Sequence, residues 1–146
     1  MGRRMEEEMK AEILSPLKLD DMLDGKQVKL SKPFTVRIVE HLDDGEMIEI
    51  RLITAPQGFV SDLASVPRFL QGVFPRFGRY NAAAIIHDWL YVSGKIEGEW
   101  IERATADRIF LAVMKASRCG WRKRTMFIAV RMFGKHLWDS HGHGKK

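Results

Sequence analysis

Asn81-Ala82-Ala83-Ala84-Ile85-Ile86-His87-Asp88-Trp89-Leu90-Tyr91 is the stretch of the chain that decides its fold. Apolar side chains fill nearly every position, which predicts a helix from about 79 to 92 that is buried on almost all sides. His87 and Asp88 interrupt this pattern at its centre. Burial of an imidazole beside a carboxylate is unfavourable by several kcal/mol unless both groups are hydrogen-bonded, paired or bound to a metal. The pair therefore indicates either a buried structural network or a catalytic or metal site.

A second helix is predicted at about 100–117, and Asp107 lies on its apolar face. Residues that recur at spacings of three and four share this face: Arg103, Asp107, Phe110, Leu111 and Met114. The short connection from Gly94 to Glu99 favours antiparallel packing of this helix against the first. We therefore expect Asp107 to accept a hydrogen bond from His87. Tyr91, one turn after His87, is expected to donate its phenol to Asp107 or to Asp88.

The third predicted helix spans about 121–138, after a break at Gly120. Its apolar stripe at helical spacing consists of Met126, Val130, Phe133 and Leu137, which is typical of core packing. Residues from Arg118 to Lys146 are strongly basic, with Asp139 as the only acid. This end is either a solvated helix face or a surface for an anionic partner. Nucleic acid is a less favoured partner, because no groove-entering motif or aromatic interleaving accompanies the charge.

The first third of the chain has the alternation of β-strands. Apolar and polar residues alternate over 28–30, 34–39 and 47–53, and Asp24-Gly25 and Asp43-Asp44-Gly45 are turn signals between these runs. The sequence therefore predicts an α+β domain, with a small antiparallel sheet at about residues 15–60 packed on a bundle of three main helices. Residues 1–14 are expected to form a charged N-terminal arm, helical or frayed. Residues 15–138 form the single domain, and 139–146 a disordered tail.

Composition limits the class of protein. The chain has 146 residues, 45% hydrophobic content, a net charge of +5 and a single cysteine, Cys119, so no intrachain disulfide is possible. No run reaches the roughly 18 apolar residues of a membrane span, and the start lacks the apolar core of a secretory signal. We expect a soluble protein without a signal peptide or transmembrane segment.

The polar residues of the first two helices suggest a specific chemistry. If Asp107 holds one nitrogen of His87, the other nitrogen can take a proton from water. Asp88, about 100° around the helix, is then expected to bind a cation. Asp62 is a candidate second ligand for calcium, magnesium or an oxygen-rich zinc site. The alternative is that Asp62 and Ser65 cap the following helix and that Arg68 neutralises one of the acids.

The pattern His87-Asp88-Trp89-Leu90-Tyr91, followed by Asp107 on the next helix and then Phe110, resembles the active-site helices of secreted phospholipases of the A-two class. In that family the histidine activates water, the second-helix aspartate orients the histidine, and the aspartate beside the histidine binds calcium. The resemblance implies these roles for His87, Asp107 and Asp88.

A broader resemblance covers about residues 56–134. It comprises Gly58 to Arg68, then Ala83 to Tyr91, then Ala106-Asp107-Arg108-Ile109-Phe110, and finally Val130-Arg131 and Gly134. This set is similar to the family called domain of unknown function 1353, found in tailed phages and prophages, with Ser61 where threonine is usual. The resemblance implies a phage origin, with a location in the virion or the host cytoplasm.

Two functions follow from these expectations. The first is a phage or prophage protein with a His/Asp hydrolase-like site that acts on a cell-envelope component, phospholipid before peptidoglycan. In it His87, Asp107 and Tyr91 are catalytic, and Asp88 and Asp62 bind calcium or another divalent cation. The second is a non-enzymatic virion, tail or assembly protein in which the same residues form a buried structural network. Its partners would be phage structural proteins, an anionic surface at the basic C-terminal helix, or further copies of itself.

The solvent exposure of His87 separates these functions. A hydrolase is expected to leave His87 beside a cleft that solvent reaches, whereas a structural network is expected to be closed, with its polar atoms paired inside the protein.

Overall fold

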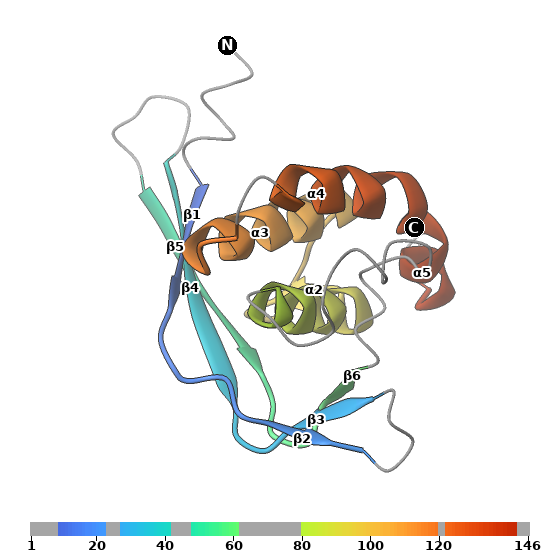
Figure 1. Ribbon diagram of the computed structural model, residues 1–146. Helices are drawn as coiled ribbons and strands as arrows, with labels where there is room; N and C mark the ends of the chain where they lie inside the picture. The colour runs from blue at the N-terminus through green and yellow to red at the C-terminus, as the bar shows by residue number, and fades with distance from the viewer. Residues whose placement is uncertain (1–8, 23–26, 42–47, 62–79, 120–121, 143–146) are drawn as a thin grey trace.

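The computed structural model describes residues 9–22, 27–41, 48–61, 80–119 and 122–142. Antiparallel strands form one side of the molecule and helices the other (Figure 1), which confirms the predicted α+β class. The predicted buried helix is α2 (Asn81–Ser93), which packs against both α3 (Arg103–Ala116) and the strand layer. None of the helices in these ranges is long and apolar enough to cross a bilayer.

The larger sheet consists of β1 (Met9–Ile13), β4 (Phe34–His41) and β5 (Ile48–Ala55), in the order β1-β4-β5. Successive side chains of a strand point to opposite faces, so the alternation in β4 places Phe34, Val36 and Ile38 together on the inner face, all fully buried. Helix α3 packs against β1. This sheet is the platform on which the helices are held.

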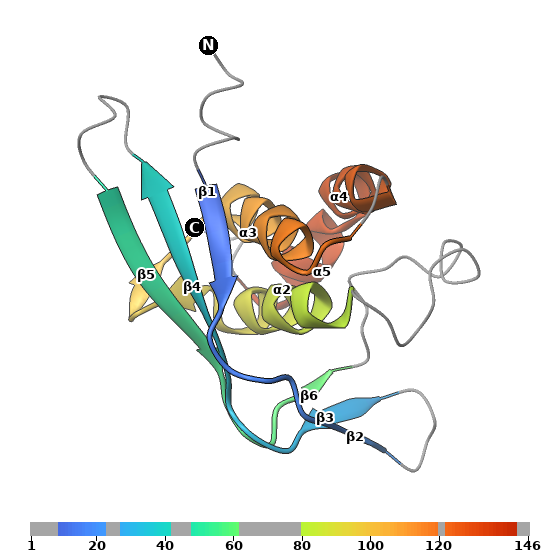
Figure 2. The same ribbon diagram turned by 60° about the vertical axis from the view of Figure 1, so that its left-hand side comes forward.

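A second three-stranded sheet contains β2 (Leu19–Asp21), β3 (Val28–Leu30) and β6 (Val60–Ser61). The prediction of one sheet was therefore wrong: the strands divide between two sheets, which Figure 2 shows at an angle to each other. The chain passes between the two sheets at three points, and a proline lies in each connection: Pro16, Pro33 and Pro56. Proline has no N–H to donate, so a ladder is interrupted where it occurs. The predicted turns at 24–25 and 43–45 lie outside the described residues.

The N-terminal prediction also needs correction, because Met9–Ile13 is a strand and not part of a helical or frayed arm. Met9 is buried, and the strand pairs with β4 in antiparallel register from Met9 with Glu40 to Ile13 with Val36. The Arg37 guanidinium donates to both carboxylate oxygens of Glu12 at 2.7 Å across this pair. The few apolar positions of this segment are enough for a strand that covers one edge of a sheet.

The short connection from Gly94 to Glu99, together with the predicted start of the second helix, forms a hairpin. Strands β7 (Lys95–Ile96) and β8 (Glu99–Trp100) pair around Glu97 and Gly98, both at positive φ, which is the geometry of a tight two-residue turn. The side chain of Glu97 accepts a hydrogen bond from the backbone N–H of Leu52 at 2.8 Å. The hairpin is thus fastened to β5, and α3 begins only at Arg103.

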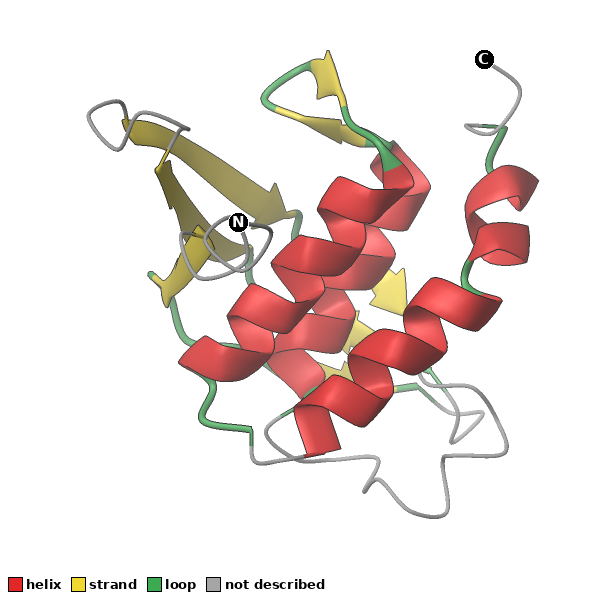
Figure 3. Cartoon of the chain, turned by 90° about the horizontal axis from the view of Figure 1, so that it is seen from above, coloured by secondary structure: helices red, strands yellow, loops and turns green. Residues whose placement is uncertain are grey.

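The third predicted helix is divided at Gly134 into α4 (Arg122–Phe133) and α5 (Lys135–Ser140). Met126 and Val130 are buried as expected, but Phe133 is 53% exposed, because the stripe does not continue through the break. Since α5 reaches Ser140, the tail predicted to begin at 139 is helical at its start, and 143–146 lie outside the described residues. Figure 3 shows α4 on the side of the helical layer that faces away from the larger sheet.

Candidate functional site

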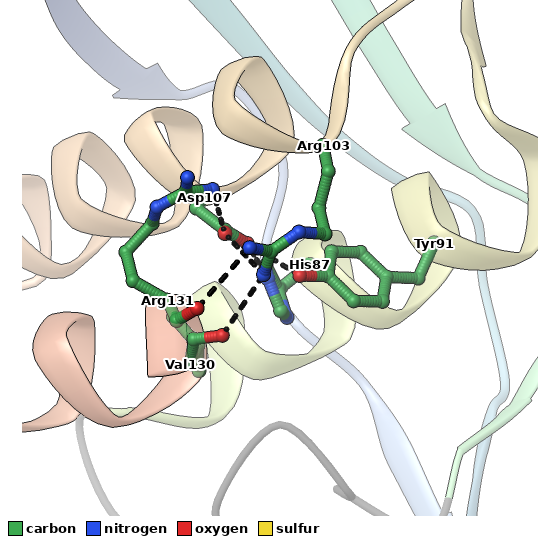
Figure 4. A network of polar contacts seen from close by, with 6 residues as sticks. All are labelled: His87, Tyr91, Arg103, Asp107, Val130 and Arg131. Atoms are coloured by element: carbon green, nitrogen blue, oxygen red, sulfur yellow. Dashed lines mark hydrogen bonds and ion pairs between the residues drawn. The ribbon is translucent and has the colours of Figure 1, made fainter. Parts of the chain in front are cut away.

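The three residues predicted to be catalytic lie together between α2 and α3. His87 Nε2 is 2.7 Å from Asp107 Oδ1, and the Tyr91 hydroxyl donates to the same oxygen at 2.7 Å (Figure 4). Of the two acceptors considered for the Tyr91 phenol, Asp107 is a partner. His87 is 1% exposed and Asp107 0%. The structure therefore places an oriented imidazole inside the protein.

The second carboxylate oxygen of Asp107 is bound by two arginines. Arg131 Nη1 lies 2.8 Å and Arg103 Nη1 3.4 Å from Asp107 Oδ2. Arg103 also donates to the backbone carbonyls of Val130 and Arg131, at 3.2 and 3.1 Å. The last carbonyls of a helix have no partner within it, so this guanidinium satisfies the end of α4. His87, Tyr91, Arg103, Asp107 and Arg131 are called the Asp107 network below, and it connects α2, α3 and α4.

Helical spacing and aromatic packing position these groups. His87 and Tyr91 are four residues apart on α2, and Arg103 and Asp107 are four apart on α3, so each pair shares a face. The Phe110 ring lies 4.7 Å from the His87 ring, centroid to centroid. The Trp138 ring of α5 meets Tyr91 edge-on at 5.1 Å. These rings pack on His87 and Tyr91, which are each 1% exposed, whereas the Arg131 side chain at the edge of the network is 37% exposed.

Gly134 allows this close approach. A Cβ at this position would lie 2.5 Å from the Val130 carbonyl oxygen and 2.6 Å from the Tyr91 hydroxyl oxygen. Both distances are shorter than a carbon and an oxygen tolerate. The residue between α4 and α5 therefore has to lack a side chain for Tyr91 to reach Asp107.

The electrostatics of Asp107 determine which atom of His87 carries a proton. Burial alone would raise the pKa of the Asp107 carboxyl, but the hydrogen bond and charge of His87 and the hydrogen bonds from Tyr91 and Arg131 outweigh it, and the pKa lies below its ordinary value of 3.8. An ionised carboxylate only accepts hydrogen bonds, so we assign the donated proton to His87 Nε2. Burial, and then the charge of Asp107, raise the pKa of the Tyr91 phenol, which therefore remains a donor.

A pH dependence follows from this shift. Because the pKa of Asp107 is lower in the folded than in the unfolded protein, its stabilisation is present above 3.8 and is lost as pH falls through the folded value. The difference in free energy of unfolding between wild type and Asp107→Asn is expected to be constant well above pH 3.8 and to shrink as the pH falls below this value. Urea titrations at a series of pH values measure it. A difference that does not change with pH would contradict the assignment.

Asp88 takes part in a separate contact. It is 7% exposed, and its Oδ2 accepts a hydrogen bond from the hydroxyl of Ser61, which is itself 3% exposed at the end of β6. This contact ties α2 to the second sheet. Within the described ranges, no three His, Cys, Asp or Glu side chains gather closely enough to hold a metal ion.

The remaining expectations for a metal site fall on Asp62, Ser65 and Arg68, which lie outside the described residues. The cation-binding roles of Asp62 and Asp88 thus stay predictions. Within the Asp107 network the structure presents an imidazole fixed by a carboxylate.

Sequence reasoning did not anticipate two arginine contacts. Arg103 was placed on the face of Asp107, and its spacing of four residues was the available signal for an ion pair. Arg131 comes from α4, and no local pattern indicated its contact with Asp107. The one sequence signal for Arg131 is that it belongs, with Val130 and Gly134, to the set of residues that resembles the family.

The fold and this network define the chain as an α+β domain with a largely buried polar network among its helices. The family model described as "Protein of unknown function (DUF1353)" matches residues 37–130, which is more than half of the chain. The chain therefore belongs to this family. The match includes every member of the Asp107 network except Arg131. No curated protein and no solved structure matches the chain significantly.

Proposed function

We propose that this chain is a non-enzymatic phage or prophage protein, of the virion, tail or assembly type, in which the Asp107 network fixes one packing of the helices. One observation carries the proposal. Asp107 is 0% exposed, and its two oxygens are bound by four side chains, His87, Tyr91, Arg103 and Arg131. The acceptor and its His87 and Tyr91 donors are buried, which matches the expectation for a structural role rather than for a hydrolytic site, and only the arginines at the edge of the network are partly exposed.

Charge compensation supports this reading. A buried carboxylate is unfavourable unless it is paired and hydrogen-bonded, and Arg103 and Arg131 offset its charge here. Each bond has a fixed direction, so only one arrangement of α2, α3 and α4 satisfies all of them. The proposed location is the virion or the host cytoplasm, and the proposed partners are phage structural proteins or further copies of the chain.

A cation-dependent hydrolase is the second candidate, and the 2.7 Å contact of His87 with Asp107, together with Tyr91, favours it. In that case His87 is the general base, Asp107 orients it, and Asp88 with Asp62 binds calcium. The substrate would be a cell-envelope component, phospholipid before peptidoglycan. This candidate has weaker support than the structural one, because His87 is 1% exposed and a general base has to reach water and substrate.

Substitution of His87 distinguishes the two candidates. Under the structural proposal, His87→Ala lowers the free energy of unfolding by about 1 to 3 kcal/mol, because Asp107 loses a buried donor. Urea unfolding followed by circular dichroism measures this. The same proteins are assayed for fatty-acid release from phospholipid vesicles and for muropeptide release, with and without calcium.

The exposed His136, on α5, provides the matched control, and His136→Ala is expected to change stability by less than about 0.5 kcal/mol. Wild-type protein is expected to release neither product. Release that depends on calcium and disappears in His87→Ala at unchanged stability would establish the hydrolase and overturn our proposal. Asp88→Asn then tests whether Asp88 binds the cation.

A further inference from the structure

Helix α4 exposes an apolar surface that the Asp107 network does not explain. Ile128 and Met132, four residues apart on one side of the helix, are 56% and 68% exposed. Packing on the rest of the molecule is supplied by Met126, Ala129 and Val130, which are buried. We propose that the exposed side of α4, called the α4 face below, docks on the surface of an anionic phospholipid bilayer. This inference goes beyond the proposed function and does not depend on it.

The charge of α4 selects the partner. Its sequence contains Arg122, Lys123, Arg124 and Arg131 and no acidic residue. Arg131 is committed to Asp107, and just beyond the helix Lys135 is paired with Asp139 at 2.6 Å. The described cation of the first turn is Arg124, and the positive end of the helix dipole lies at the same end of α4. Arg124 in this turn is exposed.

Basic residues beside exposed apolar side chains are the combination that binds membrane surfaces. The apolar groups enter the boundary between headgroups and acyl chains, while the cations meet anionic headgroups. A nucleic acid backbone would satisfy the cations but leave Ile128 and Met132 in water. Helix α4 lies on the side of the helical layer away from the larger sheet (Figure 3).

The larger sheet offers a matched control. On the outer face of β5, Ile48 is 55% and Ile50 59% exposed, close to the values for the α4 face. On this face Arg37, opposite Leu52, is paired with Glu12, which leaves Lys10, in the register row of Val39 and Ile50, as a single exposed cation. This surface is equally apolar but lacks a concentration of positive charge, so we expect it not to bind lipid.

The test is co-sedimentation of the full chain with vesicles of phosphatidylcholine alone or mixed with phosphatidylglycerol. Wild type is expected to bind the mixed vesicles and to be released by salt. Ile128→Asn/Met132→Asn is expected to weaken binding at least fivefold, and Arg124→Ala to weaken it and reduce its salt dependence. Ile48→Asn/Ile50→Asn is expected to bind like wild type. All substituted side chains are exposed, and circular dichroism verifies that each variant is folded.

Several outcomes would overturn the proposal. These are equal binding to both kinds of vesicle, no binding to either, or an equal loss for the α4 and the β5 double variants. Duplex DNA is tested in parallel. If it binds more tightly than the mixed vesicles and Arg124→Ala removes that binding, the α4 face is a nucleic-acid surface instead.

Discussion

Replacing Asp107 with alanine is expected to lower the free energy of unfolding by about 3 to 5 kcal/mol, the range for breaking a buried ion pair by removing one partner. The substitution leaves the donors of His87 and Tyr91 without their acceptor at a site that water does not reach. It also removes the carboxylate partner of Arg103 and Arg131, whose side chains are 17% and 37% exposed and therefore keep part of their solvation. Urea unfolding at neutral pH, followed by circular dichroism, measures the change.

Asp139 provides the control for this experiment. Its carboxylate pairs with Lys135 one turn away at the surface, and exposed pairs at this spacing contribute little. Asp139→Ala is expected to lower stability by less than about 0.5 kcal/mol. A loss below about 1 kcal/mol for Asp107→Ala would show that the network is not needed for the packing of the helices.

Substituting Gly134 with alanine is expected to cost about 3 kcal/mol, at the upper end of the usual range for overpacking. The new methyl group would meet the backbone carbonyl of Val130 at 2.5 Å and the Tyr91 hydroxyl at 2.6 Å. Backbone strain is not the reason, since Gly134 has a φ of −79° that any residue adopts. Thermal and urea unfolding of the variant give the magnitude.

A double-mutant cycle identifies the cause. Tyr91→Phe removes the hydroxyl that the methyl group would contact, so Gly134→Ala is expected to cost less in the Tyr91→Phe background than in the wild type. Lys135→Ala, at the exposed neighbouring position, is the control for helix α5. Strictly additive losses would mean that Gly134 is required for another reason.

The pairing of His87 with Asp107 could be predicted because it follows from local rules. Each residue lies on the apolar side of a helix with clear periodicity, and the connection between the helices is short enough to make them antiparallel neighbours. Tyr91 follows from the same spacing. The α+β class was predictable for a similar reason, since the alternation in β4 and the apolar run of α2 are both strong.

The corrections share a different physical origin. The contact of Arg131 with Asp107 depends on how α4 crosses α3, which no periodicity encodes. The break between α4 and α5 lies at Gly134, and the crossings between the two sheets contain Pro16, Pro33 and Pro56. The effect of such single residues is decided by their tertiary surroundings. The strand β1 is weakly apolar, and only its pairing with β4 makes it a strand.

Exchange of the ring proton on His87 Nε2 tests the central claim most directly. If the network is closed, this N–H exchanges with solvent only through global unfolding, so nuclear magnetic resonance is expected to give the same opening free energy as the slowest backbone amides of α2. A ring proton that exchanges much faster than these amides, in the folded protein, would place His87 within reach of water. That result would contradict the structural account and favour a catalytic site.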